Sequence, residues 1–213
     1  MRPSLLRPLG LLAVAASLSA CGRSAPESTA REAAPVAEAS PTSDASAAVE
    51  TPATADSLRS VVTSIAEGRC TTLEVDPETS GSTQECPGIA GYKVLVLDDD
   101  ARMSITLRSA DGAEHPLNLW GTVTSAFSSL GDSLEWRVRG AGEGAAPVAL
   151  VVEVRASEAP EDPERVTVYR AVAKVGPGGS CVTDKLAGAA ARDEVLRAAD
   201  AAPGRPCLAP PEG

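Results

Sequence analysis

This 213-residue sequence contains five cysteines and one histidine, the side chains that could form disulfides, bind a metal or act in catalysis. The lone imidazole, His115, excludes multi-histidine metal sites and leaves one histidine able to act as a general base. His115 precedes Pro116, which favours an extended or turn conformation. A general base also needs a nucleophile or substrate within hydrogen-bond reach, and no G-x-S-x-G elbow accompanies it. We therefore predict a surface or partly buried histidine and a protein that is not an enzyme.

Four of the cysteines form an even set in the C-terminal part of the chain: Cys70, Cys86, Cys181 and Cys207. In an exported protein such a set predicts two disulfides, for which three pairings are possible. We favour Cys70–Cys86 and Cys181–Cys207, because each bond closes a local loop across a turn-rich segment. The absence of a C-x-x-C pair argues against a zinc site, and we expect neither a metal nor a cofactor.

The fifth cysteine, Cys21, follows a segment typical of export signals. Arg2 and Arg7 form a cationic start, and residues 9–18 form an apolar run that is about half as long as the roughly 20 residues of a membrane-spanning helix. Residues 18–21, Leu-Ser-Ala-Cys, resemble the lipobox of bacterial lipoproteins. The resemblance implies cleavage before Cys21 and a diacylglyceryl group on its thiol.

The same resemblance implies two or three acyl chains, such as palmitate, on the mature protein. Two or more chains anchor a protein stably, whereas one gives only marginal membrane binding. Gly22 follows Cys21, whereas lipoproteins of enteric-type bacteria that stay at the inner membrane have Asp at that position. We therefore expect the protein in the cell envelope, anchored to the outer membrane and facing the periplasm.

Composition divides the rest of the chain into a tether and a domain. Residues 22–55 contain 11 Ala and no Leu, Ile, Phe, Tyr or Trp, so they cannot bury enough apolar surface to offset the entropy of ordering. We predict a signal peptide at 1–20, a lipidated cysteine and disordered Ala/Pro/Ser/Thr tether at 21–55, and a single domain at 56–213.

The predicted domain is acidic. Residues 56–213 hold 24 Asp and Glu against 15 Lys and Arg, a net charge of −9 within a chain of −10, and aromatic residues make up 2% of the chain. With no surplus of basic charge and few rings for base stacking, the protein is not expected to bind nucleic acid. An acidic domain does attract cationic proteins through long-range electrostatic steering.

Hydrophobic spacing predicts strands between two helices. The apolar residues from Leu58 to Ile65 follow i, i+3, i+4, i+7 spacing and predict a helix that ends at Gly68. Residues 189–201 predict a second helix. Apolar or alternating runs predict strands at 92–97, 102–107, 134–139, 148–155 and 165–175. The expected class is α+β, an antiparallel β-sheet meander with terminal helices packed on one face.

The strand at 134–139 carries the pattern with the most direct bearing on binding. Trp136 and its apolar neighbours alternate with Arg137 and Arg139, so the tryptophan should face the core and the arginines the other side. Antiparallel pairing would bring further charged residues to that side: Glu153, Arg155, Arg170 and Lys174. One interpretation is a set of cross-strand ion pairs on a solvated face, each worth little. The other is a basic strip for an anionic envelope partner.

Two aromatic residues, Trp120 and Phe127, lie in a less regular stretch. We expect them in the core, with a sheet edge or a pocket as alternatives. The acidic runs at 98–100 and 158–164 lack the ligand spacing of a calcium loop and predict solvated loops.

Three short segments are Cys86-Pro87-Gly88, Gly91-Tyr92 and Glu135-Trp136-Arg137. Together with the last two cysteines, they resemble a pattern found in exported bacterial proteins of unassigned function. We expect a non-enzymatic module that binds a protein or glycan of the cell envelope. The alternatives are an inhibitor of a cationic envelope hydrolase such as lysozyme, and an accessory structural lipoprotein of an envelope assembly.

Overall fold

The structure is a computed structural model that describes residues 57–162 and 164–209. The predicted signal peptide, the lipid attachment at Cys21 and the tether lie outside these residues. The elements in chain order are β1 (Leu58–Ser64), β2 (Thr71–Val75), β3 (Ser82–Pro87), β4 (Lys93–Asp99), β5 (Arg102–Arg108), β6 (Glu114–Pro116), α1 (Leu119–Thr122), β7 (Ser128–Arg139), β8 (Ala146–Ala156), β9 (Thr167–Lys174), β10 (Cys181–Ala187) and α2 (Arg192–Ala201). None of the described helices is long and apolar enough to cross a membrane.

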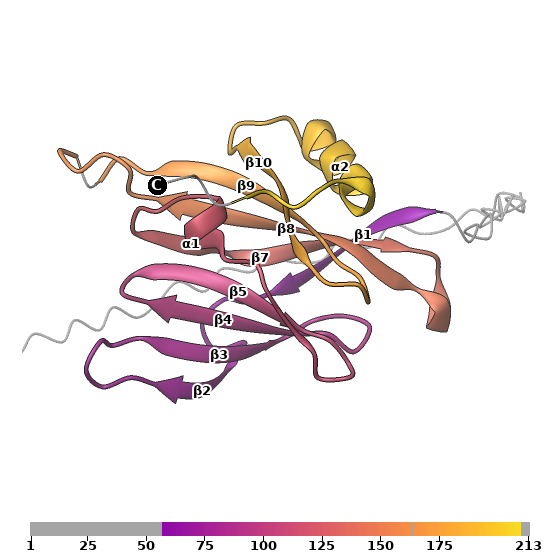
Figure 1. The fold of residues 1–213 in the computed structure, drawn as a ribbon, viewed down its shortest axis with the longest axis horizontal. Coiled ribbons are helices and arrows are strands. Elements are labelled where there is room, and N and C mark those ends of the chain that lie inside the picture. Colours follow the sequence, from indigo (N-terminus) through magenta and orange to yellow (C-terminus); the bar gives the residue numbers. More distant parts are fainter. Residues whose placement is uncertain (1–56, 163, 210–213) are drawn as a thin grey trace, which may run out of the picture. The chain divides into compact units, whose positions relative to one another are not determined.

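Two antiparallel runs of strands join into one ten-stranded sheet (Figure 1). β2 to β5 pair in chain order, with β6 added to β5, and β7 to β10 pair in the same way. A single parallel bridge between Arg102 and Ser128 links β5 to β7, and β1 pairs with the remainder of that edge of β7. The expected α+β class, dominated by antiparallel pairing, is confirmed.

One apolar core is shared by the two runs. Trp136 and Leu134 of β7 and Ile105 of β5 are completely buried in the same cluster, and the predicted inward direction of Trp136 is confirmed. The indole Nε1–H donates to Thr63 Oγ1 of β1 over 2.9 Å, so the one polar atom of the ring is satisfied. The Tyr92 ring packs beside it, with 6.3 Å between the ring centroids.

The opposite face of β8 and β9 is covered by α2 (Figure 1). Val195 and Ala199 of the helix pack on Ala149, Val151 and Val172 of the strands, and this smaller cluster is also buried. Because β8 is buried on both faces, its sequence is an almost continuous apolar run and lacks the alternation of a half-exposed strand. The predicted helix at 189–201 is confirmed as α2.

The predicted N-terminal helix is wrong, because Leu58–Ser64 forms the strand β1. β1 pairs with β7 from Leu58↔Arg139 to Ser64↔Ser133. Val61 packs against the core whereas Val62 is 62% exposed, which is the alternation of a strand. On this edge β7 pairs with β5 at one residue only, so its other backbone groups need a partner. The pairing of β1 with the backbone of β7 outweighs the local helical spacing of its apolar residues. Of the two terminal helices predicted, the described residues contain only α2.

Both favoured disulfides are confirmed. Cys70 precedes β2 and is bonded to Cys86 of β3, so this bond closes the β2–β3 hairpin. Cys181 begins β10 and is bonded to Cys207, beyond the end of α2. The second bond therefore holds the C-terminal segment against β10, where the Leu208 N–H donates to the carbonyl of the strand at 2.8 Å.

Replacing both Cys181 and Cys207 by serine should lower the free energy of unfolding by about 3 kcal/mol, because the bond closes a 26-residue loop and restricts the unfolded chain. Denaturant titration of the full chain in detergent measures the change. Thiol counting on denatured, unreduced protein supplies the control. The four domain cysteines should be unreactive, and four reactive thiols would contradict the pairing.

Candidate functional site

Arg137, which the sequence pattern assigned to a possible basic strip, instead holds elements of the domain together. Arg137 lies beneath α2 with its side chain 9% exposed. Its Nε donates to Asp200 Oδ1 of α2 over 2.6 Å, and its Nη1 donates to Ser60 Oγ of β1 over 2.8 Å. Arg137 thus connects three elements, and the helix covers the part of the face that was expected to be solvated.

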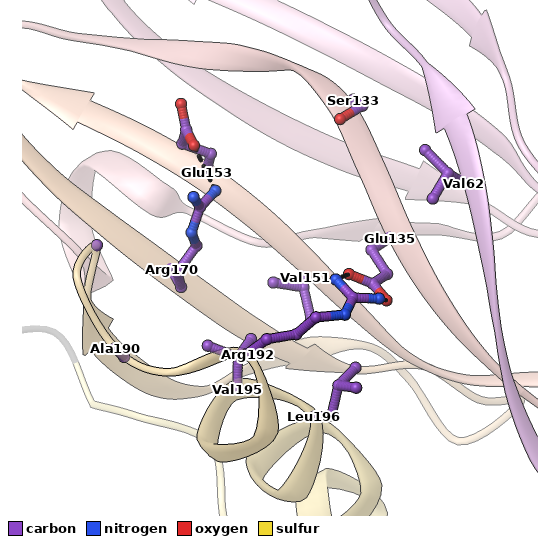
Figure 2. Close-up of a pocket in the computed structure, with 11 residues that line it drawn as sticks. Val62, Ser133, Glu135, Val151, Glu153, Arg170, Ala190, Arg192, Val195 and Leu196 are labelled. Atoms are coloured by element: carbon purple, nitrogen blue, oxygen red, sulfur yellow. Dashed lines mark hydrogen bonds and ion pairs between the residues drawn. The ribbon is translucent and has the colours of Figure 1, made fainter.

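Two further ion pairs line a groove of about 360 Å³ beside α2 (Figure 2). Arg192 of α2 donates to both carboxylate oxygens of Glu135 on β7, over 2.7 and 3.0 Å. On the neighbouring strands, Arg170 of β9 pairs with Glu153 of β8, which Arg155 also contacts. The cross-strand ion pairs of the first interpretation are therefore present at this face.

The remaining cations do not join these into a continuous basic strip. Arg139 is exposed at the end of β7 and makes no ion pair with another described residue. Lys174 donates its Nζ to the carbonyl of Arg205 over 3.1 Å. The expected placement of Glu153, Arg155, Arg170 and Lys174 on one side of the sheet agrees with their register, but the charges there are largely paired.

Trp120 and Phe127 are exposed, at 51% and 52% of their surface, so the expectation of core packing is wrong for both. Their positions follow from the segment that connects β6 to β7. Leu117 and Leu119 fill the core there, and the Leu119 N–H donates to Ser104 Oγ over 3.0 Å. In the short helix α1, burial of Leu119 leaves Trp120 to face solvent.

Arg102, the first residue of β5, connects this segment to the β4–β5 turn. Its guanidinium carbon lies 4.8 Å from the centroid of the Phe127 ring, a cation–π contact. Its Nη1 donates to Asp100 Oδ2 over 2.8 Å, and its Nε donates to the Ser125 carbonyl over 3.4 Å. Arg102 therefore covers one face of the Phe127 ring, and the rest of the ring stays exposed.

Two clefts open at this end of the domain. The first, of about 490 Å³, is lined by Asp99, Asp100, Arg102, Trp120 and Ser125. The second, of about 300 Å³, lies beside Phe127 and includes residues from β4, β5, β7 and the β8–β9 connection. Figure 1 shows α1, the β4–β5 turn and the β8–β9 connection at this end of the sheet. We define these two clefts, with Trp120, Phe127 and Arg102, as the aromatic end.

A third cleft, of about 560 Å³, lies on the other side of the 121–126 segment. Its Glu158 carboxylate accepts hydrogen bonds from Tyr169 at 2.6 Å and from Thr124 at 3.0 Å. Burial raises the pKa of Tyr169 to about 12, and the hydrogen bond to Glu158 acts in the same direction. Burial alone would raise the pKa of Glu158, but these hydrogen bonds outweigh it and lower that pKa. The charged carboxylate therefore fastens the segment that carries Trp120 to β9.

His115 is half-buried on β6, opposite Leu107 of β5. Within residues 57–162 and 164–209, no group of three or more His, Cys, Asp or Glu side chains is arranged to hold a metal ion. The solvated loop predicted at 98–100 is confirmed only for Asp100, which lies in the β4–β5 turn, where it and Ala101 have positive φ angles of 51° and 55°. It is wrong for Asp98 and Asp99, which end the strand β4 because both pair with β5.

Sequence reasoning missed Asp98, Arg102 and Ser128 as residues of the aromatic end. For Asp98 a signal exists, because alternation along β4 places it on the same side as the buried Val94 and Val96. Arg102 and Ser128 meet only through the parallel bridge between β5 and β7. Residues 26 positions apart that meet by a single bridge leave no local pattern in the sequence.

A scan against protein-family models, a search of curated proteins and a search of solved structures each return no match to this chain. The resemblances to lipoproteins and to exported proteins therefore stay predictions from the sequence.

Replacing Arg137 by glutamine should lower the free energy of unfolding by about 3 kcal/mol, because it leaves Asp200 without its cation and removes bonds to two elements. Arg139→Gln, on the same strand and with the same charge change, is the matched control and should cost less than about 0.5 kcal/mol. Denaturant titration of both variants measures the difference. Equal losses would contradict the structural role of Arg137.

Proposed function

We propose that the chain is a lipid-anchored binding module of the bacterial cell envelope. Acyl chains on Cys21 hold it at the outer membrane, facing the periplasm, and the aromatic end binds a protein or glycan of the envelope. The observation that carries this proposal is the exposure of Trp120 and Phe127 beside clefts on an ordered scaffold. The anchor and the location rest on the sequence pattern at 1–22.

Exposed aromatic rings are suited to binding. Trp and Tyr are enriched among the residues that dominate interface energies, and large rings bury much apolar area on contact. The sequence has five aromatic residues in all, so two exposed rings at one end are a large share of them. The contacts of Arg102 and Glu158 fix the surrounding segments, which lowers the entropic cost of binding.

A second candidate function is inhibition of a cationic hydrolase. The domain charge of −9 and the exposed Asp99 and Asp100 beside Trp120 would steer a basic enzyme toward the aromatic end. Such binding would weaken steeply as salt rises, because screening shortens the reach of exposed charges. An accessory role in an envelope assembly would instead give a stable partner at fixed stoichiometry that persists at high salt.

Trp120→Ala combined with Phe127→Ala should abolish the capture of an envelope partner by crosslinking in intact membranes, because both exposed anchors are lost. The free energy of unfolding should change by less than about 1 kcal/mol, since neither ring is in the core. The matched control is Leu73→Ala, which removes an apolar side chain that is 52% exposed on β2. Capture that survives the double variant would contradict the aromatic end as the binding surface.

Cys21→Ala should abolish the incorporation of labelled palmitate and move the protein out of the membrane fraction, because the thiol that accepts the lipid is lost. Metabolic labelling and fractionation of the cells measure both effects. Cys70→Ala with Cys86→Ala is the control, since it removes two cysteines away from the lipobox and should leave labelling intact. Labelling that persists in Cys21→Ala would contradict the anchor.

A further inference from the structure

The strand β1 has one edge that pairs with no described strand. Its pairing with β7 on the other edge is antiparallel along all seven residues, without a register shift. Just beyond one end of this pairing, the Ile65 N–H donates to the Asp132 carbonyl over 2.9 Å. Just beyond the other end, the Gly140 N–H donates to the Ser57 carbonyl over 3.1 Å. The odd-numbered residues of β1 are therefore the ones that hydrogen-bond to β7, because bonded and non-bonded pairs alternate in an antiparallel ladder.

The even-numbered residues of β1 direct their backbone N–H and C=O groups away from β7. They are Leu58, Ser60, Val62 and Ser64, and no described strand pairs with them on that side. The strand is accessible at its centre, where Ser60 is exposed and Val62 is 62% exposed. A row of unpaired donors and acceptors on an accessible strand is a template for pairing with a further strand.

Two other edges of the sheet are protected against such pairing. β2, at one end of the strand order, has a register shift between Thr72 and Glu74, and a bulge of this kind hinders pairing at an edge. β10, at the other end, is followed by the disulfide-bonded C-terminal segment, whose Leu208 N–H donates to the Val182 carbonyl over 2.8 Å. β1 has neither device, and residues 60–64 include no proline and no charged side chain.

Charged residues of opposite sign lie at the two ends of β1. Arg59 is at its start, where Arg139 of β7 is also found, whereas Glu67 and Asp132 lie at its end. None of these four forms an ion pair with another described residue. Asp56, which precedes the described residues, reduces the positive charge at the start but does not reverse it. Two such edges placed antiparallel match positive to negative at both ends.

We propose that β1 is a self-association edge, at which two copies of this chain pair antiparallel about a two-fold axis. With the axis at Val61, Leu58 of each copy lies opposite Ser64 of the other, and Ser60 lies opposite Val62. Every outward N–H and C=O group of the even-numbered residues then has a partner in the other copy. The interface is self-complementary, as a two-fold axis requires.

The same axis sets the positions of the charged groups. Arg59 of one copy lies at the end of β1 that carries Glu67 and Asp132 in the other copy, and the symmetry makes this arrangement twice. The exposed Val62 of each copy also loses contact with water, because a neighbouring strand now covers its edge. Hydrogen bonds, charge order and apolar burial thus agree on one register.

A second copy fits this edge better than the other occupants. The residues that precede β1 in the sequence, 22–55, contain no Leu, Ile, Phe, Tyr or Trp, so a strand folded back from them would bury little against Val62. A strand of a different protein would need its own opposite charges in the matching order. A second copy carries that order by symmetry.

The self-association is independent of the proposed function. β1 pairs with residues 133–139 of β7, whereas the clefts of the aromatic end open around Ser128, at the other end of that strand. A dimer through β1 therefore keeps both aromatic ends exposed.

The test is the mass of the full lipidated chain in detergent, measured by light scattering after size-exclusion chromatography. The parent should be a dimer that dissociates on dilution. Val62→Pro should be monomeric at concentrations where the parent is a dimer, because it removes an outward N–H that β7 does not use. Val62→Ala keeps that N–H and should remain dimeric. Denaturant titration checks that Val62→Pro is folded.

A charge exchange tests the antiparallel arrangement without a proline. Arg59→Glu should raise the dissociation constant of the dimer about tenfold, because like charges then meet at both ends of the pair. Adding Glu67→Arg to the same chain should restore the parent value, since position 59 of one copy lies at the end that carries position 67 of the other. Arg197→Glu, at an exposed position of α2, is the matched control and should leave the dimer unchanged.

Three results would overturn the self-association edge. The first is a parent chain that stays monomeric up to about 1 mM, including one whose capture of an envelope protein is lost in Val62→Pro, which would assign the edge to a foreign strand. The second is a dimer that persists in folded Val62→Pro. The third is a charge exchange that fails to restore the dimer weakened by Arg59→Glu. None of them touches the proposed function, whose test removes Trp120 and Phe127.

Discussion

The strand β7 is hydrogen-bonded along both of its edges and covered on both of its faces, and the placement of the other elements follows from these contacts. Its 12 residues pair with β8 on one edge and with β1 and β5 on the other. Its inner face places Trp136 in the core, and its outer face places Arg137 beneath α2. A guanidinium buried under a helix is tolerated only with a carboxylate partner, so α2 has to present Asp200 at that point. The Cys181–Cys207 bond then holds the chain beyond α2 against β10.

The surroundings of β7 differ along its length, with paired charges along most of the strand and clefts at its first residues. Along most of β7, charges are paired, and the ion pairs of Arg137, Arg192 and Arg170 connect strands to one another and to α2. At Ser128 the strand changes partner from β1 to β5, and the clefts of the aromatic end open around that change. Pairing there passes from one run of the sheet to the other, and the buried Ser128 Oγ at this place has no hydrogen-bond partner among the described residues. A binding site at this place would use groups that the fold itself holds in position.

The sequence predicted the structure correctly where a single local pattern was enough to specify an element or a contact. Alternation at 134–139 predicted the direction of Trp136 because that strand has one apolar face. The hairpin of β4 and β5 followed from two apolar runs around an acidic turn. Local loop closure correctly paired the four cysteines. It failed at β1, where helical spacing of apolar residues was overruled by the unpaired edge of β7. It also failed at β3, whose mostly polar sequence forms a strand because β2 and β4 hydrogen-bond to it on its two edges.

The amino-acid sequence by itself determined the class of the domain, its disulfides, its acidity and the pattern that predicts a lipid anchor, because these depend on composition, periodicity and short spacings. It also indicated that Trp120 and Phe127 lie outside the predicted strands, but not that they are exposed. Only the tertiary structure decided that, because it places Leu117 and Leu119 in the core and leaves Trp120 and Phe127 at the surface. Likewise, only the parallel bridge between β5 and β7 brings Arg102 to Ser128, since a contact between distant residues depends on how the whole sheet closes.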